Sequence, residues 1–391
     1  MVCMGFTYAI IGSGRQGTSS AFDFAVNGDA DKIILADSDL QSVQKSINLL
    51  ERLTGKSILS PAKTDAGNFD DVLKILKEAD AAVSGVPYYY NLNISNAALE
   101  AGCSLFDFGG NTEVVENQLA LDAEAEKKGI TIVPDCGMDP GMNINLIMYL
   151  FSLYDEPVEI KSYGAGLPLN PVSPWNYSLN FHINGLTNEY YGDADFIRNG
   201  KHTKVPCLEE LELIELPEPF GKLEAAVTTG GLSTLPQKLS GKIKTLENKT
   251  LRYPGHWKQF QAYKMLGLFE ETPVKIGERE ISPREFYHFL LAPHISSEDT
   301  RDAGIIKIFS RGVRNGKEES AEIEIIDKYD DTTGFTSMQK LTGWHASIIA
   351  IEAAKGRLKK GALSVDTAIS GEKLIEQLKR RKINIKINKS F

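Results

Sequence analysis

The residues of this sequence best placed to do chemistry are three glycines and an aspartate near its N-terminus. The apolar run Thr7 to Ile11 predicts a buried strand, and Gly12 ends it. Gly12 permits a tight turn, Gly14 lets the backbone approach a pyrophosphate, and Gly17 lets the next helix pack closely on the strand. The N–H groups and dipole at the start of that helix favour phosphate. This pattern predicts a dinucleotide site.

Asp37 indicates which dinucleotide is bound. It follows the second expected strand, Ile33 to Ala36, about 20 residues beyond the last glycine, where a carboxylate can reach the ribose hydroxyls. A carboxylate there accepts hydrogen bonds from NAD and repels the 2′-phosphate of NADP. The sequence therefore favours NAD, and NADP stays possible because Arg15 and Ser38 stand where they can help to hold a phosphate.

Other expected cofactor contacts follow later strands, because open parallel sheets hold their ligands at the carboxyl ends of the strands. The expected cofactor-binding residues are Gly12, Ser13, Gly14, Arg15, Gln16, Gly17, Asp37, Ser38, Asp65, Val86, Pro87, Asp107, Gly109 and Asn111.

The order of the expected strands and helices predicts an α/β fold. It comprises a Rossmann-type parallel sheet domain and an α+β substrate domain with a mainly antiparallel sheet. Strands and helices alternate over the first ~150 residues. The second part is rich in prolines and glycines, and Asn315-Gly316 predicts a hairpin joining 302–314 to 317–327. We expect a discontinuous dinucleotide-binding domain, residues 1–155 and 335–391, and a substrate-binding and dimerisation domain, residues 156–334.

Several single elements are also expected. The sequence predicts one helix over 114–128, a strand over 178–183, a buried helix over 338–355, and a basic helix over 372–382 with a solvated face.

Composition narrows the class of protein. A formal net charge of −9 argues against nucleic-acid and anionic-membrane partners, and no apolar run approaches a membrane span. The four cysteines are scattered without metal-ligand spacing, as are the histidines, so we expect a reducing cytoplasm and no bound metal. An exposed sheet in the second domain suits a homodimer.

Three further stretches carry chemistry-bearing side chains. Pro140 and Gly141 precede a helix and are expected to expose backbone donors, although a plain interdomain turn explains them equally well. Thr228 to Gly231 combines hydroxyls with paired glycines. Arg252 and His256 can bind a carboxylate and move a proton, or instead form an interdomain ion pair and a helix cap. A domain inserted into a nucleotide-binding domain is expected to place the chemistry at their junction.

These motifs resemble those of the saccharopine dehydrogenase family and, within it, the lysine 6-dehydrogenase branch. From about residue 6 to 356, the matching stretches are IGSGRQG with Asp37, LFDFGGN, VPDCGMDPGM, GLPLNPVSPWNYS, TTGGLSTLP, TLRYPGHW and SMQKLTGWHASIIAIEAAKG. Pro-Gly-His-Trp after Leu-Arg-Tyr, and Met142-Asn143 where saccharopine reductases have Asp-His, favour that branch. The tail after Gly361 fits the family less well.

The resemblance implies oxidation of an amino acid, the ε-deamination of L-lysine by NAD with release of ammonia. It implies a pocket lined by the loops around 107–111, 136–141, 228–231 and 252–256. We expect Arg252, with Thr229 and Gly230, to bind the substrate carboxylate, and His256 or Asp139 to act as base or to orient water. The expected substrate-binding residues are Cys136, Tyr177, Thr228, Thr229, Gly230, Gly231 and Arg252, where Cys136 shapes the pocket and Tyr177 excludes solvent.

Two other functions stay open. One is a saccharopine dehydrogenase or a related imine reductase acting on amino acids or polyamines. Saccharopine has three carboxylates and calls for two or three cationic residues, so Arg252 alone favours lysine. The other is an NAD-binding protein without catalysis.

Overall fold

The structure is a computed structural model that describes residues 5–391. It divides the chain into two units, each built from separate stretches of sequence. Unit 1 comprises Met1–Tyr149 and Asp330–Ile383, and unit 2 comprises Leu150–Tyr329 and Asn384–Phe391.

Unit 1 contains a parallel sheet with the strand order β17-β6-β5-β4-β1-β2-β3, which is the doubly wound order of dinucleotide-binding folds with one strand added. The apolar runs seen in the sequence form its central strands, because strands covered on both faces are apolar throughout. The strands are β1 Phe6–Ile11, β2 Ala30–Asp37, β3 Leu59–Lys63, β4 Ala81–Ser84, β5 Ser104–Asp107, β6 Thr131–Val133 and β17 Gly361–Ala362.

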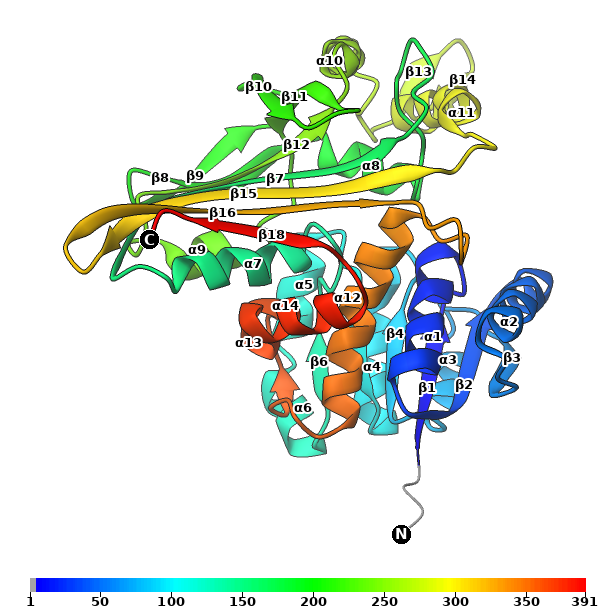
Figure 1. Cartoon of the computed structure of the whole chain (residues 1–391). Helices are drawn as coiled ribbons and strands as arrows, with labels where there is room; N and C mark the ends of the chain where they lie inside the picture. Colours follow the sequence, from blue (N-terminus) through cyan, green and yellow to red (C-terminus); the bar gives the residue numbers. More distant parts are fainter. Residues whose placement is uncertain (1–4) are drawn as a thin grey trace. The chain divides into compact units, whose positions relative to one another are not determined.

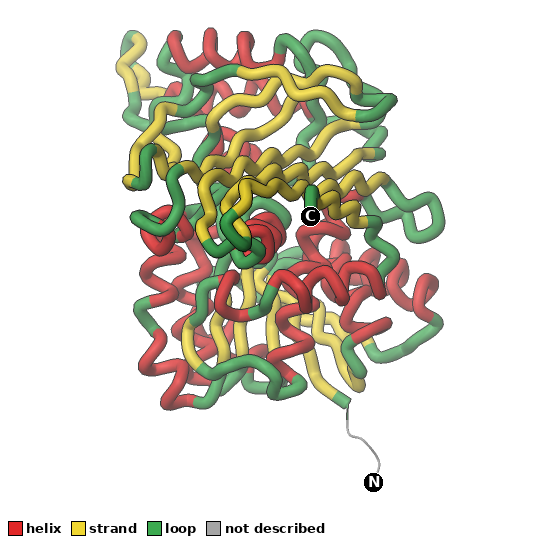
Figure 2. The backbone as a smooth tube through the Cα atoms, turned by 60° about the vertical axis from the view of Figure 1, so that its left-hand side comes forward, coloured by secondary structure: helices red, strands yellow, loops and turns green. Residues whose placement is uncertain are grey.

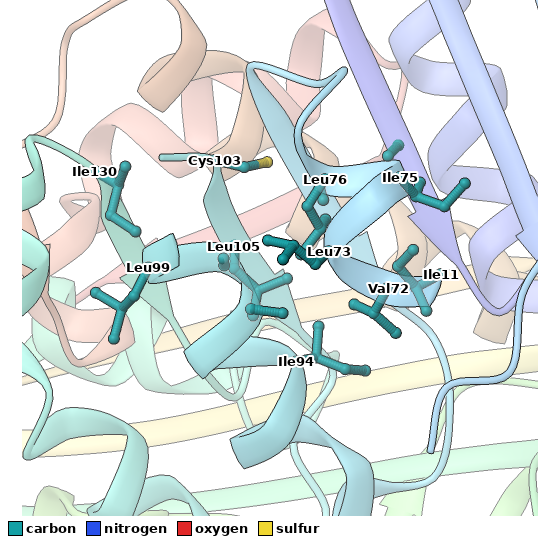
Figure 3. Packing of buried hydrophobic residues seen from close by; sticks show 14 of the residues in the cluster. Ile11, Val72, Leu73, Ile75, Leu76, Ile94, Leu99, Cys103, Leu105 and Ile130 are labelled. Atoms are coloured by element: carbon teal, nitrogen blue, oxygen red, sulfur yellow. The ribbon is translucent and has the colours of Figure 1, made fainter. Parts of the chain in front are cut away.

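Helices cover both faces of this sheet (Figure 1). On one face α1 packs against α12, where Ser20 Oγ donates to the carbonyl of Gly343 at 2.8 Å. On the other face α3 and α4 bury leucines and isoleucines against β1, β4 and β5 (Figure 3). The helices of unit 1 are α1 Arg15–Asn27, α2 Leu40–Thr54, α3 Phe69–Leu76, η1 Tyr88–Tyr90, α4 Asn91–Ala101, α5 Thr112–Leu119, α6 Asp122–Lys128, α12 Ser337–Ala354, α13 Val365–Ala368 and α14 Gly371–Arg380, and α7 Met142–Phe151 begins in unit 1 and ends in unit 2.

The C-terminal helix α14 is tied into unit 1 more firmly than its basic sequence suggests. Leu374 and Leu378 are fully buried. Arg381, just past the helix, makes a two-pronged ion pair with Asp23 of α1, with both N···O distances 2.8 Å. Because both side chains are buried, removal of one would leave an unpaired buried charge. The expected helix with a solvated face is therefore confirmed, and its opposite face is buried.

Unit 2 contains a mixed, mainly antiparallel sheet with the order β10-β11-β12-β7-β15-β16-β18, and β8 and β9 attached at β12. The strands β7, β15 and β16 run side by side for most of their length (Figure 2). The strands are β7 Glu156–Pro168, β8 Asp193–Arg198, β9 Lys201–Pro206, β10 Glu212–Leu216, β11 Gly221–Val227, β12 Thr245–Arg252, β15 Asp302–Arg314, β16 Lys317–Lys328 and β18 Ile385–Lys389.

Short helices and one small hairpin complete unit 2. They are α8 Ile183–Glu189, α9 Leu235–Leu239, α10 His256–Met265, α11 Pro283–Ile295, and the strands β13 Val274–Ile276 and β14 Arg279–Ile281. Within the described residues, no helix is long and apolar enough to cross a membrane.

The predicted fold class is confirmed, as are the Asn315-Gly316 hairpin and the buried helix α12. The expected strand over 178–183 is wrong, because the N–H of Leu179 bonds to the carbonyl of Ile295 and not to a neighbouring strand. The expected helix over 114–128 is interrupted before Asp122, whose carboxylate accepts from the N–H of Ala362 in β17.

The unit boundaries differ from the expected domain limits at the C-terminus. Residues 335–391 were expected to belong to the dinucleotide-binding domain. The last segment, β18, instead pairs antiparallel with β16 and belongs to unit 2. Its alternating isoleucines and lysines suit a strand at a sheet edge, where one face is solvated.

Candidate functional site

The glycine loop of unit 1 has the geometry that a pyrophosphate requires. Gly12 has φ +93°, which favours glycine, and a Cβ on Gly17 would lie 2.2 Å from the carbonyl oxygen of Gly12. A Cβ on Gly14 would meet no protein atom within 4 Å. Gly12 and Gly17 are therefore required by the fold, whereas the space beside Gly14 is open.

The helix α1 begins at this open space. Gly14 is its N-cap and provides no side-chain cap, so the positive end of the helix dipole is left for an anion. The residues present thus fit a dinucleotide phosphate. Arg15 and Gln16 follow in the first turn; Arg15 is exposed and Gln16 is half-buried.

Asp37 supports the glycine loop as well as standing at the expected ribose position. Its Oδ2 accepts from the N–H of Ser13 at 2.9 Å, and its Oδ1 accepts from the N–H of Asp39 at 3.2 Å. The side chain is only half-buried, so the carboxylate keeps a surface for a ligand. Ser38, whose hydroxyl donates to Asp37 at 3.3 Å, is exposed.

The remaining expected cofactor residues lie in loops that follow β3, β4 and β5. Asp65 is exposed and accepts from the N–H of Gly67. Val86 and Pro87 are half-buried after β4, and the Val86 side chain lies against Gly12. Asn111 caps α5 by accepting from the N–H of Val114.

Asp107 is an internal anchor and has no surface for a cofactor, which corrects its expected role. Its side chain is fully buried, accepts from the N–H of Gly109 at 2.7 Å, and accepts from Gln118 Nε2 at 2.7 Å. Burial raises the pKa of Asp107 to about 6, although these donors act in the opposite direction. Gly109 itself has no room for a side chain, since a Cβ would clash with Asp135.

The turn before α7 does not offer the free backbone donors that Pro140 and Gly141 were expected to expose. The N–H of Gly141 donates to Asn143 Oδ1 at 3.0 Å, and the N–H of Met142 donates to the carbonyl of Gly137 at 2.9 Å. These donors are already used within the turn, so that expectation is wrong.

The side chains of this turn are mostly enclosed. Cys136 is fully buried, its thiol points at the carbonyl of Val133, and burial raises the pKa of that thiol well above its ordinary value. Cys136 therefore shapes the turn from within and does not contact a ligand as expected. Asp139 is half-buried and accepts from Asn143 Nδ2 at 2.7 Å.

Unit 2 gathers Tyr177, Glu189, Tyr190, Arg252 and His256 into one group, which we call the Arg252 cluster. Arg252 Nε donates to Tyr190 Oη at 2.9 Å, and Nη1 donates to the carbonyl of Leu251 at 3.0 Å. The guanidinium lies 5.1 Å from the ring of Tyr177 and 5.7 Å from that of Trp257. Its Nη2 lies 3.6 Å from Glu189 Oε2.

His256 is held in a fixed neutral state by the same cluster. Its Nδ1 lies 3.2 Å from the carbonyl of Trp175, which can only accept, so Nδ1 carries the proton. Its Nε2 then accepts from the hydroxyl of Tyr190 at 3.0 Å. Burial, and secondly the charge of Arg252, lower the pKa of His256 well below its ordinary value. His256 has no exposed surface, which corrects its expected role as catalytic base.

The loop Thr228 to Gly231 holds the end of α8 in place. The Thr229 N–H donates to the carbonyl of Glu189 at 2.9 Å, and its hydroxyl donates to the carbonyl of Asn188 at 2.7 Å. Thr228 is buried and pairs with Thr250. Gly230 is exposed, with φ +87°, and Gly231 is buried. The expected substrate loop thus positions Glu189.

Glu189 and Tyr190 were missed in the sequence. Their neighbours in the chain offered no motif, and only the tertiary structure brings them to Arg252. Within residues 5–391, no three His, Cys, Asp or Glu side chains are grouped so that they could hold a metal ion.

Comparisons with known proteins agree with this architecture. Residues 8–133 match the saccharopine dehydrogenase NADP-binding domain, and residues 137–383 match the saccharopine dehydrogenase C-terminal domain. The chain belongs to the saccharopine dehydrogenase family. Residues 8–133 therefore form its nicotinamide-dinucleotide-binding part.

Individual relatives are distant. The mitochondrial alpha-aminoadipic semialdehyde synthase of Rattus norvegicus is 23% identical over 246 residues, which are 60% of this chain and 26% of the rat protein. The NADP(+)-dependent, L-glutamate-forming saccharopine dehydrogenase of Saccharomyces cerevisiae is 24% identical over 315 residues, 76% of this chain and 66% of that enzyme. The chain thus spans less than two thirds of the length of either relative.

A solved structure shows the shared fold. Apo saccharopine dehydrogenase (L-Glu forming) from Saccharomyces cerevisiae superposes with a TM-score of 0.78, covering 99% of this chain and 100% of that chain at 17% identity.

Alanine at Gly14 and at Gly17 should have opposite effects. Gly14→Ala adds a methyl group where no protein atom lies, so the melting temperature should stay unchanged while NAD affinity falls about 10-fold or more. Gly17→Ala places Cβ against the Gly12 carbonyl and should cost about 1–3 kcal/mol of stability. Calorimetric titration with NAD and thermal unfolding separate the two effects. Unaltered NAD binding by Gly14→Ala would contradict the assignment.

Asp107→Asn should change how stability depends on pH. The raised pKa means that folded Asp107 keeps a proton that the unfolded chain releases, so the stability of the native protein falls as pH rises from about 4 through about 6. A rise of about 2 units corresponds to a loss on the order of 3 kcal/mol.

Asparagine stays neutral, and Gln118 can turn its amide to accept from it, because Gln118 Oε1 has no partner among the described residues. Urea unfolding from pH 4 to 8 should show native stability declining relative to the variant. Parallel curves would rule out a raised pKa.

Proposed function

We propose that this protein is a lysine 6-dehydrogenase: an NAD-dependent enzyme that oxidatively deaminates the ε-amino group of L-lysine. The observation that carries the proposal is the charge of the Arg252 cluster. Among the described residues, Arg252 is the only lysine or arginine that bonds or pairs with its members. One guanidinium suits a substrate with one carboxylate.

The alternative substrate class calls for more positive charge. Saccharopine has three carboxylates, and each one taken from water needs donors or a cation to replace its hydration. The Arg252 cluster contains one cation and one acid, so its formal charge is already balanced. This balance supports lysine over saccharopine, although the yeast relative keeps saccharopine dehydrogenase as the second candidate.

The proposed reaction removes one hydride and the amino group from the lysine side chain. Lysine loses a proton from its ε-ammonium and a hydride from the neighbouring carbon, which leaves a protonated imine, and NAD, when bound, would accept the hydride. Water then hydrolyses the imine to 2-aminoadipate 6-semialdehyde and ammonia, and the semialdehyde cyclises to piperideine-6-carboxylate. The proton must leave first, because an ammonium nitrogen has no lone pair with which to stabilise the developing positive charge.

The chain divides the work between its units. Unit 1 supplies the glycine loop and Asp37 for the cofactor, and the free carboxylate surface of Asp37 supports NAD over NADP. Unit 2 supplies Arg252 for the carboxylate and aromatic walls for the aliphatic stem. His256 cannot take the amine proton because both ring nitrogens are engaged inside the protein. Asp139 remains our candidate base in unit 1.

A coupled screen tests the function directly. The purified chain is mixed with NAD or NADP and with L-lysine, saccharopine, ornithine or 1,5-diaminopentane, while NADH absorbance and ammonia are measured. We expect NADH and ammonia from lysine with NAD. Saccharopine-dependent turnover that forms glutamate would replace the proposal, and NAD binding without turnover of any amine would favour the non-catalytic reading.

Arg252→Lys should lower kcat/KM for lysine by about 100-fold, because an ammonium cannot reproduce the fork of the guanidinium. NAD affinity should stay unaltered in this variant, since Gly14 and Asp37 lie in unit 1. A parallel loss of NAD binding would show that Arg252 also supports the cofactor.

We further propose a homodimer in the cytoplasm. On α11, Phe289 is 76% exposed and lies near the exposed Phe286 and Leu290 in sequence, and such apolar surface suits an interface. Phe289→Asp should halve the mass measured by light scattering while the chain stays folded. Val26→Asp, on the exposed end of α1 in unit 1, is the control. A native protein that is already monomeric would refute the dimer.

A further inference from the structure

The Arg252 cluster contains polar atoms whose partners are missing from the described chain. Oε2 of Glu189 and Oη of Tyr177 are enclosed and make no hydrogen bond. Arg252 has five N–H groups, but only Nε and Nη1 donate to acceptors among the described residues. Each enclosed polar group without a partner costs about 1–3 kcal/mol, so their gathering around one guanidinium calls for an explanation.

An ordinary ion pair does not explain it. A charge-assisted hydrogen bond closes to about 2.7–2.9 Å, whereas Arg252 Nη2 and Glu189 Oε2 stay 3.6 Å apart. Glu189 is held back from Arg252 at its own backbone, because Thr229 bonds to the carbonyls of Asn188 and Glu189. The two groups are thus close enough for their charges to attract each other. They are too far apart to form a hydrogen bond.

Glu189 is the most exposed member of the Arg252 cluster. The Glu189 side chain is 30% exposed, although Arg252 is almost completely buried. Next to it, Gly230 is exposed, and a Cβ built on it would meet nothing within 4 Å. The solvent side of the cluster is therefore the side of Glu189.

We propose that Glu189, Arg252 and Tyr177 together bind the zwitterionic head group of an α-amino acid. Arg252 Nη2 and the Tyr177 hydroxyl donate to the carboxylate, and the Glu189 carboxylate accepts from the α-ammonium. Only the identification of the amino acid as lysine rests on the proposed function. Glu189 thereby becomes a specificity-determining residue, and its partner is the α-amine, which takes no part in the reaction.

Charge balance supports this ligand class. A zwitterionic head group brings one charge of each sign to a pair that has one of each, whereas a diamine or a fatty acid leaves one charge unmatched. Burial raises the pKa of Glu189 to about 7, although Arg252 acts in the opposite direction, and a bound ammonium favours the ionised acid.

Calorimetric binding of unreactive head-group analogues tests the proposal without turnover. L-Norleucine has the complete head group, hexanoate lacks the amine, and pentylamine lacks the carboxylate. The native protein should bind L-norleucine at least about 10-fold more tightly than either fragment. Equal affinity for norleucine and hexanoate would overturn the proposal.

Two variants assign the contacts. Glu189→Gln should weaken L-norleucine by about 100-fold and leave hexanoate unaltered or tighter, because it removes an acid that repels the carboxylate. Glu271→Gln, which alters another glutamate paired with an arginine in unit 2, is the matched control and should bind like the native protein. Equal weakening of both ligands by Glu189→Gln would show that Glu189 only supports the fold.

Tyr177→Phe keeps the test decisive if Glu189→Gln fails to fold. The Tyr177 hydroxyl has no hydrogen-bond partner among residues 5–391, so its removal should not lower the melting temperature. It should weaken L-norleucine and hexanoate alike by about 10-fold. Unaltered binding would show that Tyr177 does not contact the ligand, and the proposed position of the carboxylate would be wrong.

The outcomes also separate this proposal from the proposed function. If selectivity for the head group depends on Glu189 but lysine is not oxidised, the proposed head-group site is supported and the proposed lysine reaction is refuted. Oxidation of lysine and of 6-aminohexanoate with equal kcat/KM would support an amine dehydrogenase and refute the proposed head-group site. A kcat loss in Glu189→Gln on both substrates, with unaltered norleucine binding, would make Glu189 a base and refute its head-group role.

Discussion

The cofactor-binding unit depends on the close approach of β1 and α1. With the Gly17 Cα against the carbonyl of Gly12, no side chain fits between strand and helix. This contact aims the N-terminus of α1 at the open space beside Gly14. It also brings Ser13 to the end of β2, where Asp37 accepts from its N–H. The phosphate site and the ribose site are therefore held by one packing constraint.

In unit 2 the corresponding constraint is the buried guanidinium of Arg252. A charge without water needs partners, and this one takes a phenol, a carbonyl and several aromatic faces. As a consequence, the hydroxyl of Tyr190 and both ring nitrogens of His256 form hydrogen bonds inside the protein. The histidine that looks most suited to proton transfer is in fact a neutral acceptor at the end of a structural chain.

The residues wrongly expected to touch ligands share one property. Asp107, Cys136 and His256 are all completely buried and all engaged with groups of their own unit. Their residue types and motif positions were right for chemistry, but their polar atoms already have partners inside the protein. Conversely Glu189, which keeps surface and an unsatisfied oxygen, stands in a stretch without any motif.

The sequence by itself determined the glycine loop, Asp37, the Asn315-Gly316 hairpin, the fold class and the family. These features depend on backbone conformation and spacing within short segments, which local residue types control. Only the tertiary structure decided which polar side chains stay exposed to solvent. Arg252 meets Tyr190, and His256 meets Trp175, across more than 60 residues of chain. Hydrogen-bond partners at such separations leave no local pattern, because they exist only once the elements pack.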